Sequence, residues 1–120
     1  NAEDKELGDL VMHLAKSFAR LQQATAWIAE NGLKDPMQAG AASSDYLKMF
    51  GLVALGFMWA RMAKVSVAKL ALGEGDKAFH ENKVKLARYY MTKVMPETSS
   101  LLSKIMAGAD PLMSFAEEAF

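Results

Sequence analysis

The first third of the chain has the hydrophobic pattern of an amphipathic helix. From Asp4 to Asn31, residues suited to a core recur every three or four positions, at Leu7, Leu10, Val11, Leu14, Phe18, Leu21, Thr25 and Ile28. This spacing places them on one face of an α-helix. Asn31-Gly32 follows, and glycine readily adopts the left-handed conformation that ends many helices. We therefore expect the first helix to end at this pair.

A second helix is predicted to begin between Asp35 and Asp45 and to run to about Leu72. Asp35-Pro36 has the form of an N-cap followed by a first helical proline, while Ser43, Ser44 and Asp45 offer later caps. Two apolar faces are predicted on it. One face comprises Tyr46, Met49, Phe50, Val53, Phe57 and Ala60, and the other comprises Leu47, Ala54, Met58 and Met62.

The segment from Met49 to Ala60 contains no charged residue. A helix that is apolar nearly all round is either central in its bundle or covered by a partner. A membrane span needs ~20 mainly apolar residues, whereas Lys48 and Arg61 bracket only twelve, so we expect burial in protein and no membrane span. Gly51 and Gly56 weaken a helix, and close approach of a neighbouring helix would explain both.

Gly73-Glu74-Gly75-Asp76 is predicted to stop the second helix, turn the chain and cap a third helix. The third helix carries apolar positions to Ile105 and ends near Gly108, with a kink expected between Thr92 and Pro96 because an interior proline removes a hydrogen bond. Asp110-Pro111 opens a short helix, with Asp110 as its cap, to about Ala119. The sequence thus predicts an all-α fold, an antiparallel up-and-down bundle of three long helices plus a short C-terminal helix, as one domain over residues 1–120.

Composition narrows the possible partners. The chain is 52% hydrophobic and 23% charged, so it has enough apolar residues to fold. Fourteen basic and fourteen acidic residues cancel, so the basic field typical of a nucleic-acid-binding protein is missing. There is no cysteine, and the first residues are mainly acidic, unlike a secretory signal. We expect a cytoplasmic protein that does not bind nucleic acid.

Candidate chemistry is sparse. His13 and His80 have no glutamate three residues before them, as a di-iron site in a bundle would require, and Val84 stands where a zinc-protease motif starting at His80 would need a second histidine. Glu117 and Glu118 are adjacent, so on a helix they would diverge rather than share a proton. No catalytic, cofactor-binding or metal-ligating residue is therefore predicted in this chain.

Basic residues gather in the middle of the chain. They are Lys48, Arg61, Lys64, Lys69, Lys77, Lys83, Lys85, Arg88 and Lys93, while acids concentrate at both ends. A solvated helix surface explains this distribution, and so does a docking surface for an acidic patch or a phosphate-bearing ligand. The nine methionines are similarly open to two interpretations, pliable core filling or a surface adapted to a partner.

Four segments, in order, resemble the C-terminal extension of a bacterial acyl-CoA dehydrogenase subfamily. They are Tyr46–Gly51, Phe57–Ala63, Pro96–Thr98 in the third helix, and Gly108–Met113 leading to the Glu-Glu-Ala-Phe end. The resemblance covers nearly the whole chain. The subfamily includes enzymes that act on 3-methylthiopropanoyl-CoA. The motifs concern packing, so they carry no site residue onto this chain.

The resemblance implies a parent enzyme that oxidises an acyl-CoA to its 2,3-enoyl-CoA. FAD accepts the hydride and a glutamate removes the alpha proton; both would be held by catalytic domains upstream of Asn1. For this chain we expect a non-catalytic role in packing on the catalytic body and in homo-oligomerisation. Arg61, Lys64 or Arg88 could contact the CoA phosphates at the mouth of the acyl-CoA pocket. The alternative is a free-standing helical protein-interaction module, whose Met-rich surface grips a partner helix.

Overall fold

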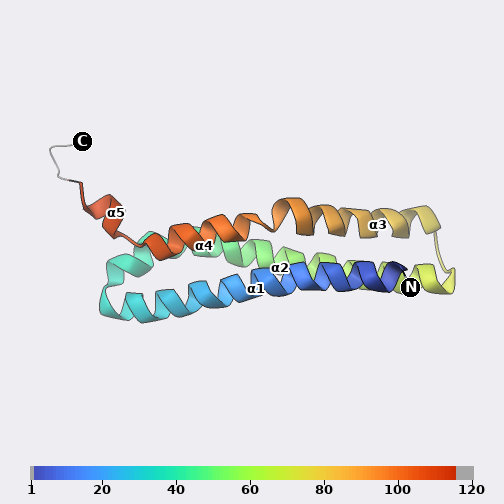
Figure 1. Ribbon diagram of the computed structural model, residues 1–120, viewed down its shortest axis with the longest axis horizontal. Coiled ribbons are helices and arrows are strands. Elements are labelled where there is room, and N and C mark those ends of the chain that lie inside the picture. The colour runs from blue at the N-terminus through green and yellow to red at the C-terminus, as the bar shows by residue number, and fades with distance from the viewer. Residues whose placement is uncertain (1, 116–120) are drawn as a thin grey trace.

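The computed structural model describes residues 2–115, with side chains from residue 4 onward. The elements are α1 (Ala2–Lys34), α2 (Pro36–Leu72), α3 (Lys77–Tyr89), the π-helix η1 (Tyr90–Val94), α4 (Glu97–Ala107) and α5 (Asp110–Met113). The described part has no strand, and the all-α prediction is confirmed. Figure 1 shows α1, α2 and the rod formed by α3, η1 and α4 running antiparallel along an elongated molecule of 66 × 28 × 18 Å.

The first turn differs from the prediction. The helix does not end at Asn31-Gly32 but continues to Lys34, and Gly32 has no positive φ. Instead, Gly32 lies where α1 meets α2, because a Cβ built on it would come 3.0 Å from the Cβ of Ala39. The turn is the single residue Asp35, whose carboxylate accepts a hydrogen bond from the Met37 amide at 3.1 Å. Asp35 was the earliest of the predicted starts, and it is the correct one.

The second turn forms as predicted. Gly73 has φ 66° and ends α2, with its amide donating to the Leu70 carbonyl at 3.2 Å. Asp76 then caps α3, since its Oδ1 accepts from the amides of Ala78 at 3.0 Å and Phe79 at 3.4 Å. Hydrogen bonds of Gly73 at the end of α2 and of Asp76 at the start of α3 thus pair backbone groups that each helix end would otherwise leave free. The turn brings α3 back beside α2.

The third helix is interrupted where the kink was predicted, between Thr92 and Pro96, and the interruption has a specific form. The helix widens into η1, and the Met95 amide donates to the Tyr90 carbonyl, five residues back, at 2.9 Å. Pro96 has no amide hydrogen, so the regular ladder cannot continue through it, and α4 begins at Glu97. The widening also places Tyr90 so that its hydroxyl donates to the Leu52 carbonyl on α2 at 2.5 Å.

The core consists of two clusters of buried residues along α2, and the half-buried Leu14 of α1 packs against both. The inward residues of α2 are Met49, Val53, Gly56, Ala60, Ala63 and Val67, between α1 on one side and α3 and α4 on the other. The predicted face of α2 is therefore partly wrong, because Phe50 and Phe57 are 53% exposed. Gly56 does allow close approach, since the Met95 methyl occupies the place of its missing side chain, whereas nothing lies within 4 Å of a Cβ built on Gly51.

The C-terminal helix α5 ends earlier than predicted, at Met113, and its N-cap is a different residue from the predicted one. Ala109 occupies the cap position without a side-chain hydrogen bond, and Asp110 is the first helical residue. Gln38 holds this junction to α2, because its Oε1 accepts from the Ala109 amide at 2.8 Å and its Nε2 donates to Asp110 at 3.3 Å. The predicted end near Ala119 lies outside the described residues.

By length and composition, α2 is also apolar enough to cross a membrane. The same properties belong to the central helix of a soluble bundle, and α2 packs against both neighbouring rods along its length.

Candidate functional site

An apolar groove runs between α1 and α2. Its first half, with a volume of about 610 Å³, is lined only by apolar side chains, which include Val11, Phe18, Phe50, Phe57 and Met58. Each of these five is about half exposed, at 49–53%. The third rod packs on the other side of α1 and α2, so no element of the described chain covers the groove.

The second half of the groove continues toward the start of α1. It shares Val11, Leu14 and Phe57 with the first half and has a volume of about 720 Å³. Two charged residues, Arg61 and Lys64, line this half, and both are basic. They stand three residues apart on α2, so they lie on one side of the helix. The groove is thus apolar along its middle and positive at one end.

Arg61 and Lys64 have no described acidic partner. The Arg61 guanidinium lies 5.9 Å from the centroid of the Phe57 ring, close enough for a weak cation–π attraction. Among the described ion pairs, none involves either residue. Both side chains are exposed, and an anion that enters this end of the groove would meet both charges.

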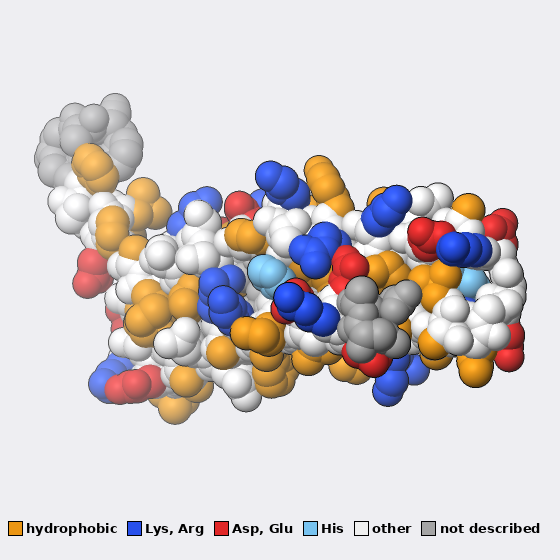
Figure 2. All heavy atoms as spheres, turned by 45° about the vertical axis from the view of Figure 1, so that its right-hand side comes forward, with side chains coloured by type: hydrophobic (Ala, Val, Ile, Leu, Met, Phe, Trp, Pro, Cys, Tyr) orange, Lys and Arg blue, Asp and Glu red, His pale blue; other side chains and the backbone are white. Residues whose placement is uncertain are grey.

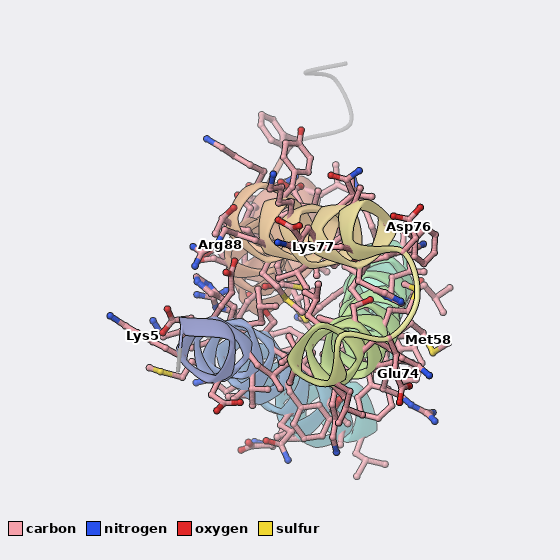
Figure 3. All side chains as sticks on the ribbon, turned by 90° about the vertical axis from the view of Figure 1, so that its right-hand side faces the viewer. Lys5, Met58, Glu74, Asp76, Lys77 and Arg88 are labelled. Atoms are coloured by element: carbon pink, nitrogen blue, oxygen red, sulfur yellow. The ribbon has the colours of Figure 1, made fainter. Side chains whose placement is uncertain are left out.

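Arg88, the third residue that the sequence singled out, lies elsewhere. It projects from α3 toward α1, where its Nε is 2.7 Å from Glu6 Oε1 and its guanidinium is 4.0 Å from Asp9 Oδ2. Figure 3 shows Arg88 and the groove residue Met58 on opposite sides of the bundle. The hydrogen bond and charge of Glu6 raise the pKa of Arg88 above its ordinary value. The structure therefore brings together only Arg61 and Lys64.

A polar hollow of about 680 Å³ lies at the α2–α3 turn. Both acidic and basic residues line it, including Glu6, Lys69, Glu74, Lys77 and Lys85. Figure 3 shows Glu74 and Lys77 at this end of the bundle. Lys69 is already paired with Glu74 at 3.1 Å. On the face seen in Figure 2, acidic and basic side chains likewise lie among one another. This hollow has no dominant charge that would select a ligand.

The described residues offer no metal site, since they contain no group of three or more histidine, cysteine or acidic side chains that could hold an ion. His80 lies against α2, where its Nδ1 is 3.1 Å from the Ser66 hydroxyl. Ser66 is 3% exposed, so this pair joins α3 to α2 inside the bundle.

The α1 side of the groove was missed in the sequence. Val11 and Phe18 were counted among the core residues of the first helix, yet both are about half exposed. The available signal was the width of the apolar face, because Leu10 and Val11 are adjacent and cannot both point into one narrow core. Leu10 is 1% exposed and takes the inward position.

Comparison with known proteins gives one family. A search of curated proteins finds no match. A family model described as "Acetyl-CoA dehydrogenase C-terminal like" matches residues 1–116, which is nearly the whole chain. The match agrees with the resemblance of the sequence to a C-terminal domain of the acyl-CoA dehydrogenase family. The chain therefore belongs to the family of acetyl-CoA dehydrogenase C-terminal-like domains.

Proposed function

We propose that this chain is the non-catalytic C-terminal domain of a cytoplasmic, FAD-dependent acyl-CoA dehydrogenase, and that its groove between α1 and α2 is an assembly surface. The parent enzyme, of the subfamily that includes 3-methylthiopropanoyl-CoA dehydrogenase, oxidises an acyl-CoA thioester to the 2,3-enoyl-CoA. Its catalytic domains hold FAD and the base. The helical domain packs on that catalytic body and contributes to a homo-oligomer.

The observation that carries this proposal is the uncovered groove. Contiguous apolar surface that stays exposed on a soluble protein often marks an interaction site. Here three aromatic side chains, Phe18, Phe50 and Phe57, are about half exposed in one groove. Burying each such ring further is worth on the order of 1 kcal/mol at ~25 cal/mol per Å². Association with a protein partner that covers the rings is favoured by this free energy, which is not available while the rings remain exposed to water.

A cysteine placed in the groove tests the proposal, because the chain has no cysteine of its own. Ala54→Cys puts a thiol in the groove, and Ser103→Cys puts one on the exposed surface of α4 as a control. Labelling by a thiol reagent is followed by mass spectrometry of the peptide concerned. In the parent enzyme we expect residue 54 to react at least tenfold more slowly than the exposed residue 103. Equal rates at residues 54 and 103 in the parent enzyme would refute an assembly role for the groove.

Contact with CoA phosphates is supported for fewer residues than the sequence suggested. Arg61 and Lys64 lie together with no described acidic partner, whereas Arg88 is already paired with Glu6 and Asp9. If Arg61 and Lys64 bind CoA, their reversal to glutamate raises the parent enzyme's KM for acyl-CoA while kcat stays constant. An unchanged KM removes this role.

The alternative function is a free-standing helical protein-interaction module that binds a partner helix in the same groove. The visible spectrum of the protein produced from the whole reading frame separates the two. A flavin spectrum that is bleached by an acyl-CoA supports the dehydrogenase domain. A colourless protein of 120 residues supports the module.

A further inference from the structure

We infer that the groove of one copy binds the C-terminal segment, residues 110–120, of a second copy. The inference rests on the proposed assembly role and names the occupant of the groove. A reciprocal exchange, in which each copy inserts its segment into the other, closes a symmetric dimer.

The charge of the groove selects its occupant. Its lining carries two charges, Arg61 and Lys64, and both lie beyond Phe57 toward one end. The complementary ligand is a peptide with an apolar part, for the middle of the groove, followed by acids. Arg61 and Lys64 lie about 6 and 10 Å along α2 from Phe57, at ~1.5 Å per residue.

The C-terminal segment has this order of side chains. Leu112 and Met113, on α5, are 65% and 57% exposed, and Glu117 and Glu118 follow in the sequence. Glu117 lies five positions after Leu112, which corresponds to ~7 Å in a helix and ~17 Å when extended. This range includes the ~10 Å between Phe57 and Lys64, and its lower end is close to the ~6 Å between Phe57 and Arg61. Figures 1 and 2 show α5 standing away from the body of the bundle, with apolar side chains on it.

The segment cannot reach the basic end of its own groove. The chain leaves the bundle beside Trp27, whose ring would lie 3.3 Å from a Cβ on Gly108. The basic end lies beside Leu7, about 30 Å away along α1 at ~1.5 Å per residue. From Ala109, with α5 helical and the rest fully extended, Glu117 reaches only about 20 Å. A second copy has no such limit, because its segment can enter at the level of the bases.

Other occupants fit the charges less well. Two copies placed groove to groove would bring Arg61 and Lys64 of both copies to one interface, with no acid among the groove residues of either copy. Among the acids at the start of α1, Glu6 and Asp9 are already paired with Arg88. Glu117 and Glu118 follow the exposed Leu112, Met113 and Phe115 in the sequence.

An intermolecular disulfide tests the inference in the 120-residue chain. One preparation carries Ala54→Cys in the groove, and a second, tagged preparation carries Met113→Cys on α5. Each copy then has one cysteine, so a disulfide between tagged and untagged chains is necessarily intermolecular. The matched control pairs Ala54→Cys with Ser103→Cys. We expect at least tenfold more mixed disulfide with residue 113 than with residue 103, and a yield equal to the control overturns the inference.

Charge exchange tests the orientation of the segment. Arg61→Glu with Lys64→Glu in the Ala54→Cys copy should lower the yield at least fivefold. Glu117→Lys with Glu118→Lys in the Met113→Cys copy should restore most of the loss. All four side chains are either exposed or outside the described core, so loss of folding is not expected, and circular dichroism checks this. A loss without restoration contradicts the proposed pairing.

The two proposals fail in different ways. If residue 54 is protected in the parent enzyme but the cross-link in the 120-residue chain does not exceed its control, the catalytic body covers the groove, and only the inference is refuted. If residue 54 reacts as fast as residue 103 in the parent enzyme, the assembly role itself is refuted.

Discussion

The methyl group of Met95 occupies the space that a side chain on Gly56 would need. Met95 follows the π-helix and is 1% exposed, and Gly56 faces it from the middle of α2. The widened turn before Pro96 and the glycine in the opposite helix therefore fit each other. Leu14 of α1 also comes within 3.4 Å of a Cβ at this position, so all three rods meet here.

Gly56→Ala should destabilise the bundle, although alanine is the better helix former. The new methyl would displace the end of the Met95 side chain, which is flexible but only 1% exposed, and overpacking typically costs ~1–3 kcal/mol. Gly51→Ala is the matched control, since nothing lies within 4 Å of its Cβ, and it should stabilise the helix by ~0.5–1 kcal/mol. Urea unfolding of both variants measures the difference. Equal free energies of unfolding would show that Gly56 and Met95 are not packed as described.

Thr98 joins α4 to α1 through a buried polar layer. Its Oγ1 accepts from Arg20 at 3.1 Å, lies 3.4 Å from the Ser17 hydroxyl and donates to the Met95 carbonyl at 2.8 Å. Thr98→Val keeps the shape but removes the hydroxyl, so Ser17, at 1% exposure, loses this partner. We expect a loss of ~1–3 kcal/mol in the free energy of unfolding. Ser100→Ala, on the exposed side of α4, should change it by less than ~0.5 kcal/mol.

Asp35 alone forms the turn between the two longest helices, and its side chain caps α2. Asp35→Ala should cost ~0.5–2 kcal/mol, because the Met37 amide loses its partner. Asp35→Asn keeps an oxygen in the capping position and should retain most of the stability. Thermal unfolding of the two variants distinguishes the capping role from an effect of charge, which both substitutions remove.

The sequence predicted the elements better than their ends. Apolar spacing and the Gly73–Asp76 turn were sufficient for three antiparallel rods, since both are local features. The end of α1 was wrong because Gly32 has two possible uses, a left-handed cap or a close helix contact. Only the position of Ala39 in the folded chain decides between them.

The candidate site was harder to predict from the sequence than the helices were. The absence of charge between Met49 and Ala60 indicated a helix covered on most sides, but not which side remains open. Phe50 and Phe57 follow the same apolar pattern as Met49 and Val53, and only the direction of approach of α1 and the third rod separates the exposed pair from the buried one. Arg61, Lys64 and Arg88 likewise belong to one run in the sequence, and the turn at Gly73 puts Arg88 on a different rod.

Tyr90 should make the stability of the bundle depend on pH in the alkaline range. Its hydroxyl donates to the Leu52 carbonyl, and burial raises its pKa above the ordinary value of 10.0. In the unfolded chain tyrosine loses its proton near pH 10, while in the folded protein it keeps the proton to higher pH. Above pH 10 the unfolded state thus binds fewer protons, and the free energy of unfolding falls as pH rises, until Tyr90 ionises in the folded state as well.

Tyr90→Phe isolates this contribution, because phenylalanine preserves the ring that packs on Trp59 and does not titrate. At pH 7 the variant should be less stable by ~0.5–1.5 kcal/mol, the usual net value of a hydrogen bond. Between pH 7 and 9 the difference should stay constant, and above pH 10 it should shrink, since only the natural protein loses stability there through residue 90. Lysines and the other tyrosines titrate in both proteins and cancel in the difference. Urea unfolding at intervals of pH measures it, and a difference that is constant across pH 10 would mean that Tyr90 ionises equally readily in the folded and unfolded chains.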